Sequence, residues 1–139
     1  MSHSYSIHPD LDLIVMRYSG HVTLNDLRDG FVASIGDPRY RPGMMELSDF
    51  SAADDTDVGF AGVMAIADKV RESYASSAGI VRIAHCAPSD IAYGMARMYQ
   101  TIMSDEENVA IGLFRSLPEA LEFLNLNTPE MIARLERDR

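Results

Sequence analysis

The chain of 139 residues is 47% apolar and 24% charged, which predicts a single globular domain over residues 1–139. Its 21 acidic and 12 basic residues give a formal net charge of −9, and this negative charge disfavours nonspecific binding to nucleic acid or to an anionic membrane. The longest apolar run, residues 58–67, is too short to cross a bilayer, and the single cysteine, Cys86, excludes an internal disulfide, so we expect a cytoplasmic protein without a membrane span.

The amino-terminal region predicts a hairpin followed by a helix. Residues 5–8 and 11–19 are rich in strand-forming residues on either side of a short Pro-Asp turn. Thr23 and Asp26 have the spacing of a capping box, so a helix should begin there and end near Gly36. Four apolar residues follow one another at helical spacing in this stretch: Leu24, Leu27, Phe31 and Ile35.

The middle of the chain predicts a short apolar strand, a polar loop and a long helix. The strand begins at Met44, and the loop over residues 49–57 carries four carboxylates and two hydroxyls. An apolar helix should follow from about residue 57 to residue 74 and be broken by residues 76–79.

The last part of the chain continues to alternate strands and helices. Residues 80–86 and 108–114 predict strands, and residues 87–90 predict a turn. A capping box at residues 116–119 begins one helix, and a final helix should begin at residues 128–130. The helix between the two strands should have a buried side formed by Ile91, Met95, Met98 and Ile102.

The element order is therefore ββαβαβαβαα, an α/β fold. Strands that are separated by helices pair in parallel. We therefore expect a mixed, mostly parallel five-stranded sheet with one antiparallel strand at its N-terminal edge.

Segments along nearly the whole chain carry a family resemblance. They are residues 20–23, 37–43, 48–51, 94–98 and 109–120. In these segments the chain resembles the SpoIIAA-like branch of the STAS superfamily, the anti-sigma-factor antagonists. The resemblance implies a small cytosolic domain whose parallel strands lie in nearly sequential order and which serves as a phosphorylation-switched interaction module.

One departure from the family pattern bears on switching. Switched antagonists carry Asp-Ser-Ser-Gly at the start of the helix after the third strand, with the serine as phosphate acceptor. The nearest match here, residues 55–59, has Val58 in the middle, and Thr56 is the only hydroxyl close by. Neighbouring acidic residues would repel a phosphate on Thr56. We therefore expect a non-catalytic interaction or regulatory module that is not switched by serine phosphorylation.

The loops after the third and fourth strands are the predicted ligand or partner surface. Parallel strands bring both loops to one edge of the sheet, where helix N-termini leave N–H groups available. Helix capping and ordinary solvation also account for polar residues at such positions. The residues concerned are Asp49, Ser51, Asp55, Thr56, Asp57, Ser89 and Asp90.

No residue pattern specifies a metal site or a catalytic centre. The acidic loop lacks the spacing of an EF-hand, and His3, His8 and His21 have no fixed spacing. His85 and Cys86 are adjacent on a predicted strand and therefore point to opposite faces. We predict no metal, no cofactor and no enzymatic activity.

The nine methionines leave a second functional class open. Flexible thioethers fill irregular cores and also line adaptable apolar binding sites. Because the family fold is distantly similar to CRAL-TRIO lipid-binding domains, a carrier or sensor of a small apolar, lipid-like molecule is the alternative to a module with an unknown protein partner. A closed apolar cavity above about 300 Å³ would favour the carrier, and a solid core with an exposed apolar patch would favour the interaction module.

Strand alternation predicts that one face of the sheet is covered by the crossover helices and that the other is mixed. Arg17, Glu46 with Ser48, and Arg82 should interrupt the mixed face. Such a surface is too apolar to stay exposed, so we expect the terminal helix or a second copy of the chain, in a two-fold homodimer, to cover it. The apolar residues expected on this face are Leu13, Val15, Met44, Ile80, Val109 and Ile111.

Overall fold

The structure, a computed structural model, describes residues 2–74 and 79–138. Its strands are β1 (His3–His8), β2 (Leu13–Val22), β3 (Met45–Thr56), β4 (Val81–Cys86) and β5 (Val109–Phe114). Its helices are α1 (Leu24–Ile35), α2 (Phe60–Tyr74), α3 (Asp90–Ile102), α4 (Leu117–Phe123) and α5 (Pro129–Arg137), with a short 3-10 turn, η1 (Pro9–Leu11). This order of strands and α-helices confirms the predicted α/β fold.

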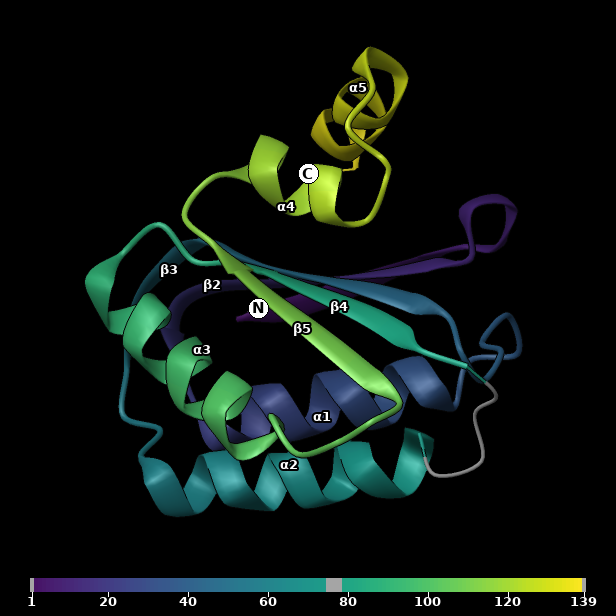
Figure 1. Ribbon diagram of the computed structural model, residues 1–139. Coiled ribbons are helices and arrows are strands. Elements are labelled where there is room, and N and C mark those ends of the chain that lie inside the picture. The colour runs from purple at the N-terminus through teal and green to yellow at the C-terminus, as the bar shows by residue number, and fades with distance from the viewer. Residues whose placement is uncertain (1, 75–78, 139) are drawn as a thin grey trace.

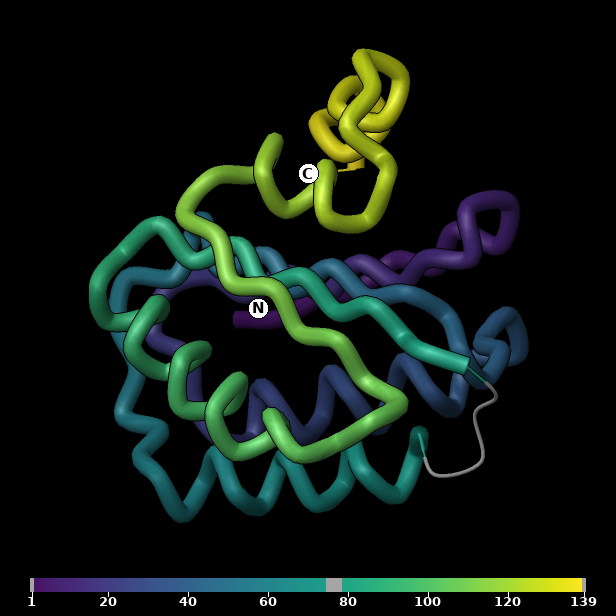
Figure 2. Tube along the Cα trace, viewed as in Figure 1, coloured from purple at the N-terminus to yellow at the C-terminus, as the bar shows by residue number. Residues whose placement is uncertain are grey.

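The five strands form one sheet in the order β1-β2-β3-β4-β5. β1 is antiparallel to β2, and the remaining neighbours are parallel, as predicted. Helices α1, α2 and α3 lie on one face of the sheet, and α4 and α5 lie on the other (Figure 1). The trace in Figure 2 shows how the chain returns over the sheet after β5, which places the C-terminus on the side of α4 and α5.

Side-chain caps begin three helices at the residues that the sequence predicts. The Thr23 hydroxyl accepts the Asp26 amide N–H at 3.1 Å, and the Asp26 carboxylate accepts the Thr23 amide N–H at 2.9 Å, which completes the capping box of α1. Ser116 and Thr128 cap α4 and α5 in the same way, each by accepting an amide N–H three residues further along.

Strand β3 is longer than predicted. The expected loop over residues 49–57 is strand as far as Thr56, and α2 begins at Phe60 rather than at residue 57. The second half of β3 pairs only with β2, which is itself ten residues long, and two register shifts insert extra residues into β3. Pairing with a long neighbour therefore keeps this polar segment extended. The predicted break at residues 76–79 falls mainly outside the described residues.

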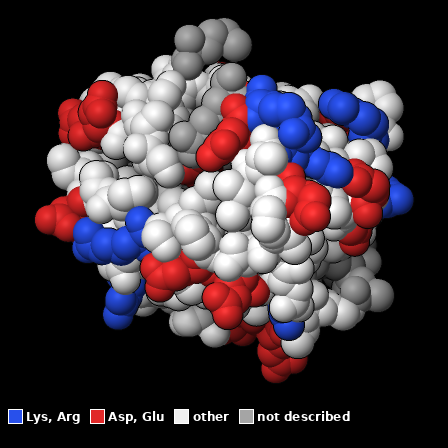
Figure 3. All heavy atoms as spheres, turned by 90° about the horizontal axis from the view of Figure 1, so that it is seen from above, with Lys and Arg blue, Asp and Glu red and all other residues white. Residues whose placement is uncertain are grey.

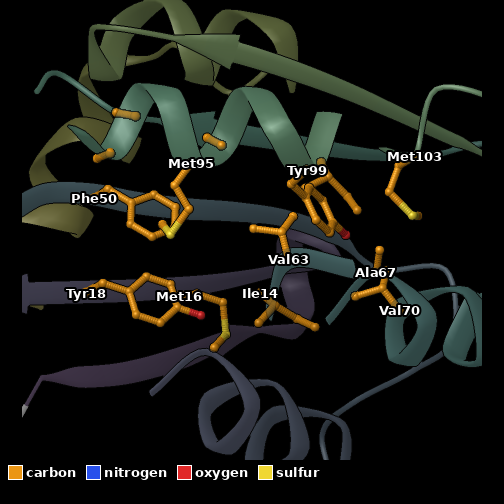
Figure 4. Close-up of a cluster of buried hydrophobic side chains, with 14 of the residues drawn as sticks. Ile14, Met16, Tyr18, Phe50, Val63, Ala67, Val70, Met95, Tyr99 and Met103 are labelled. Atoms are coloured by element: carbon orange, nitrogen blue, oxygen red, sulfur yellow. The ribbon is translucent and has the colours of Figure 1, made fainter. Parts of the chain in front are cut away.

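The larger core lies between the sheet and helices α1 to α3 (Figure 4). Met95 of α3 and Met103, which follows the last residue of α3, are buried in it at 5% and 1% exposure, so these two thioethers fill the core. The other labelled side chains are Ile14, Met16, Tyr18, Phe50, Val63, Ala67, Val70 and Tyr99.

The second face of the sheet is covered by α4 and α5. Leu13, Val15 and Leu47 are fully buried there, and they pack against Leu121 of α4 and Leu135 of α5. Coverage by the terminal helices, one of the two predicted alternatives, is thus confirmed. A second copy of the chain is not needed to cover this face. The homodimer therefore stays a prediction, but the need to cover this face no longer supports it. Seen from the same side, acidic and basic side chains are interspersed (Figure 3).

The predicted facing of β3 is wrong. Glu46 and Ser48 lie under α1 to α3, whereas Leu47 enters the core under α4 and α5. The alternation along β3 is the same for either choice, and only the pairing with its neighbours decides which set faces which layer. Three residues expected under the terminal helices, Met44, Val109 and Ile111, also belong to the larger core, and Ile80 is 70% exposed.

Arg17 and Arg82 do lie on the face covered by the terminal helices. The Arg17 guanidinium donates to the Leu135 carbonyl at 3.2 Å, and Arg82 donates to the Phe123 carbonyl at 3.1 Å. Both arginines therefore donate to backbone carbonyls near the C-terminal ends of α4 and α5. Cations are favoured at such helix ends.

The packing of α4 can be tested with Leu121→Ala. Because Leu121 is fully buried, its truncation should lower the free energy of unfolding by about 2–5 kcal/mol. The exposed neighbour Glu122 provides the control Glu122→Ala, which should change stability by less than about 0.5 kcal/mol. Urea denaturation measures both, and equal effects would show that α4 does not pack on the sheet.

Candidate functional site

Acidic residues at the end of β3 gather around His21 of β2. The His21 Nδ1 atom lies 3.1 Å from an Asp55 carboxylate oxygen, and Nε2 lies 3.8 Å from an Asp57 oxygen. All three side chains are about half or more exposed. Water screens such pairs, so this cluster marks an acidic surface and contributes little to stability.

The Thr56 hydroxyl is engaged within the connection from β3 to α2. It donates to the Val22 carbonyl at 2.7 Å and accepts the Val58 amide N–H at 3.1 Å. The Sδ atom of Met95 lies 3.7 Å from the same oxygen. Thr56 thus joins the end of β2 to the approach to α2.

Asp49 and Ser51 lie apart from these residues, on the α4 and α5 side. Asp49 is 7% exposed and accepts the Ser51 backbone N–H at 2.9 Å as well as its hydroxyl. The Ser51 oxygen is 3.6 Å from the Cys86 sulfur. Both residues line a surface hollow of about 340 Å³, together with Arg17 and Asp138.

Ser89 and Asp90 form the third group, at the start of α3. The Ser89 hydroxyl accepts the Ala92 amide N–H at 3.2 Å and caps the helix. Asp90 pairs with Arg115 at 2.7 Å, and the Arg115 guanidinium lies 4.1 Å from the centre of the Tyr93 ring. The seven predicted residues therefore form three separate groups, of which two lie along β3 or just after it and one lies at the start of α3. They do not surround one pocket.

Two exposed apolar side chains stand near this end of the sheet. Phe60, 63% exposed, begins α2, and Ile91, 50% exposed, lies in the first turn of α3. Both helices begin at the end where β3 and β4 finish (Figure 1). We call Phe60, Ile91, Asp55, Asp57 and Asp90 the strand-end surface.

A cavity of about 70 Å³ lies between the sheet and helices α1 to α3, where the carrier alternative requires one, but its small volume and polar lining were not predicted. Its walls include apolar side chains such as Met16, Phe50 and Met95, part of the cluster shown in Figure 4. Polar groups on the sheet side come from β2, β3 and β4, namely the Tyr18 hydroxyl, Glu46, Ser48 and His85. In the sequence, the signal for this site is the pair of polar residues at alternate positions of an otherwise buried strand.

Glu46 reaches into this cavity from the central strand. The Ser48 hydroxyl donates to one Glu46 carboxylate oxygen at 2.8 Å. Burial raises the pKa of Glu46 above its ordinary value, and the Ser48 hydrogen bond opposes that rise. The carboxyl group is therefore held toward its neutral form.

His85 is the neighbour of Ser48 across the sheet, in register with it. It is 6% exposed, and within residues 2–74 and 79–138 its Nδ1 atom has no hydrogen-bond partner. Burial lowers the pKa of His85 to about 4, so the ring is neutral at physiological pH. Cys86 lies in the opposite core, which confirms that these adjacent residues face opposite sides.

Comparison with known proteins finds no matching family model and no matching curated protein. A solved structure with a TM-score of 0.55 is an uncharacterized DUF3478-family protein with a SpoIIAA-like fold from Shewanella loihica PV-4, 13% identical over 88% of this chain and 94% of that one. Another is the anti-sigma factor antagonist SpoIIAA in its unphosphorylated form, with a TM-score of 0.51 and 12% identity over 96% of this chain and 97% of that one. The chain has a SpoIIAA-like fold.

At these identities the likeness establishes the SpoIIAA-like fold, as the family resemblance implied, and leaves the activity to be inferred from the site. Among the residues that the structure describes, no three His, Cys, Asp or Glu side chains are grouped so that they could hold a metal ion. In the same residues, no helix of this SpoIIAA-like domain has the length and apolar character to cross a bilayer.

The stability of this SpoIIAA-like domain should fall on acidification because of His85. The ordinary pKa of histidine is 6.5 and the folded value is about 4, so the unfolded chain takes up the proton first. The stabilising contribution is complete above about pH 6.5 and is lost as the pH falls toward 4. Between about pH 7.5 and 4.5, the wild type should lose about 2 kcal/mol more than His85→Gln in urea denaturation. An equal loss in the two proteins would contradict a buried neutral histidine.

Proposed function

We propose that this chain is a non-catalytic, cytoplasmic interaction or regulatory module that binds a protein through its strand-end surface. The observation that supports this is the exposure of Phe60 and Ile91 at the starts of α2 and α3, within three residues along the chain of the exposed carboxylates Asp57 and Asp90. Large apolar side chains within an acidic surface suit a partner that has apolar pockets bordered by basic residues. The net charge of −9 would further attract such a partner.

The proposed module is not switched by serine phosphorylation. Val58, which stands where the switched family has its serine, is 8% exposed. The nearby Thr56 hydroxyl already bonds the Val22 carbonyl and the Val58 amide. A phosphate on Thr56 would break both hydrogen bonds and place more negative charge beside Asp55 and Asp57.

The alternative, a carrier or sensor of a lipid-like molecule, has less support. The interior cavity of about 70 Å³ is well below the roughly 300 Å³ at which ordinary ligand pockets begin. Its sheet side also carries Glu46, Ser48 and His85, and a purely apolar ligand could not form a hydrogen bond with any of them.

The proposed surface can be tested by affinity capture from cells of the native host followed by mass spectrometry. The double variant Phe60→Ser, Ile91→Ser should lose proteins that the wild type retains, because it removes the exposed apolar contacts. The variant Val32→Ser, Ile80→Ser is a matched control, since these two residues are 50% and 70% exposed at other places. Loss in both variants, or in neither, would count against the strand-end surface.

The same variants distinguish a foreign partner from a homodimer. Light scattering on the purified wild type gives its mass, and a dimer built on the strand-end surface should become a monomer in Phe60→Ser, Ile91→Ser. A wild-type dimer that persists in this variant would place the two-fold contact elsewhere.

Thr56→Val tests independence from phosphorylation. The variant keeps the side-chain shape but has no hydroxyl, so stability should fall by about 1–2 kcal/mol as the Val22 carbonyl and Val58 amide lose their partner. Capture of partner proteins should be unchanged once the protein is folded. Loss of a partner from folded Thr56→Val would show that the hydroxyl, or a phosphate on it, takes part in binding.

A further inference from the structure

The interior cavity offers a ligand hydrogen-bond acceptors and one ionisable carboxyl group. Among the described residues that line it, Glu46 is the only charged side chain, and no lysine or arginine contributes. An anionic ligand would therefore find no cation there and would meet a carboxyl group. The charge distribution selects against anions and favours a molecule that brings positive charge.

Glu46, Ser48 and His85 present acceptors within one small area. One Glu46 oxygen accepts the Ser48 hydroxyl, which leaves the second carboxylate oxygen and the Ser48 lone pairs for a ligand. The Nδ1 atom of neutral His85 has no partner in the described residues, and the tautomer that carries the proton on Nε2 would offer it to a ligand as a further acceptor. An ammonium group, with up to three N–H donors, matches this set.

Aromatic rings extend from these acceptors across the sheet. The Tyr18 and Phe50 rings stack with their centres 4.8 Å apart, Phe50 meets the His85 ring at 6.1 Å, and His85 lies 5.3 Å from Tyr99. Tyr18, Phe50 and Tyr99 all line the cavity. Aromatic side chains attract organic cations through their ring quadrupoles, most strongly where water is excluded.

The size of the cavity and its exposed border limit the ligand. A dry cavity of about 150 Å³ accepts benzene, so a volume of about 70 Å³ suits roughly three non-hydrogen atoms. Leu27 and Phe31 of α1 and Ile66 of α2 line the cavity and are only partly buried, whereas the other apolar lining residues are buried. The entrance therefore lies between α1 and α2.

We propose that this cavity binds a small alkylammonium ion, with Glu46 as its counter-ion and Ser48 and His85 as further acceptors. A cation beside Glu46 favours the ionised carboxylate, so the carboxyl group releases its proton to water when the ion binds, and the resulting pair buries no net charge. This site is separate from the strand-end surface, and neither proposal depends on the other.

The test is an NMR titration of the wild type with ethylammonium chloride, with ethanol and sodium acetate as neutral and anionic comparisons of similar size. Ethylammonium should shift the signals of His85 and of the Met16 and Met95 methyl groups in a saturable way. It should bind at least about tenfold more tightly than ethanol, and acetate should leave these signals unchanged. Ethanol binding as tightly as ethylammonium, or no shift with any of the three, would overturn the proposal.

Two variants assign the interaction. Glu46→Gln keeps the shape of the side chain and removes its charge, so ethylammonium should bind at least about tenfold more weakly. Phe50→Leu keeps an apolar side chain and removes a ring, and binding should weaken about fivefold. Glu72→Gln, an exposed position on α2, is the control and should bind as the wild type does.

Other outcomes have a definite meaning. If folded Glu46→Gln binds ethylammonium as tightly as the wild type, or if shifts occur only at the exposed carboxylates around His21, the ion pairs only with the surface. Either result would overturn the proposal. If neither cavity variant folds, the preference of the wild type for ethylammonium over ethanol decides the question, because it needs no substitution.

Discussion

The burial of β3 on both faces is the constraint on which the rest of the structure depends. β2 and β4 flank its first half, α1 to α3 cover one face, and α4 and α5 cover the other. Every side chain from Leu47 to Phe50 is therefore buried in one of two layers. Leu47 joins the smaller core, Phe50 joins the larger one, and the polar side chains between them remain inside. Glu46, which is partly buried, and Ser48, which is buried, line the cavity beneath α1 to α3 for the same reason.

Local patterns and connectivity were enough to predict the order of elements, the helix caps and the sheet. The Thr23 capping box and the proline-assisted starts of α4 and α5 act within a few residues, so the sequence displays them directly. The length of β3 could not be read in this way. Residues 51–56 are small or polar and resemble a loop, and they are extended because β2 pairs with them through two bulges, which is a nonlocal effect.

The candidate sites show the same division between local and nonlocal information. Parallel pairing allowed the polar residues after β3 and β4 to be placed toward one end of the sheet, but their partners come from elsewhere in the chain. His21 on β2 meets Asp55, and Arg115 beyond β5 meets Asp90. Glu46 was assigned to the wrong face because a charged residue in a strand ordinarily faces water. An interior cavity reverses that expectation. The alternation of β3 indicates that Glu46 and Ser48 share a face, but it does not indicate which layer that face meets.

The polar groups of the cavity limit stability from both directions of pH. Because the pKa of Glu46 is raised in the folded protein, its contribution to stability is complete below the ordinary pKa of 4.5 and is lost as the pH rises through the folded pKa. The contribution of His85 to stability has the opposite dependence and is lost on acidification. Apolar residues of similar volume would remove both effects, so a binding role gives a physical reason for the polar pair. Met95 lines this cavity, and its sulfur lies 3.7 Å from the Thr56 hydroxyl at the end of β3. An occupant that displaces Met95 would therefore change its contact with Thr56, which lies between Asp55 and Asp57 of the strand-end surface.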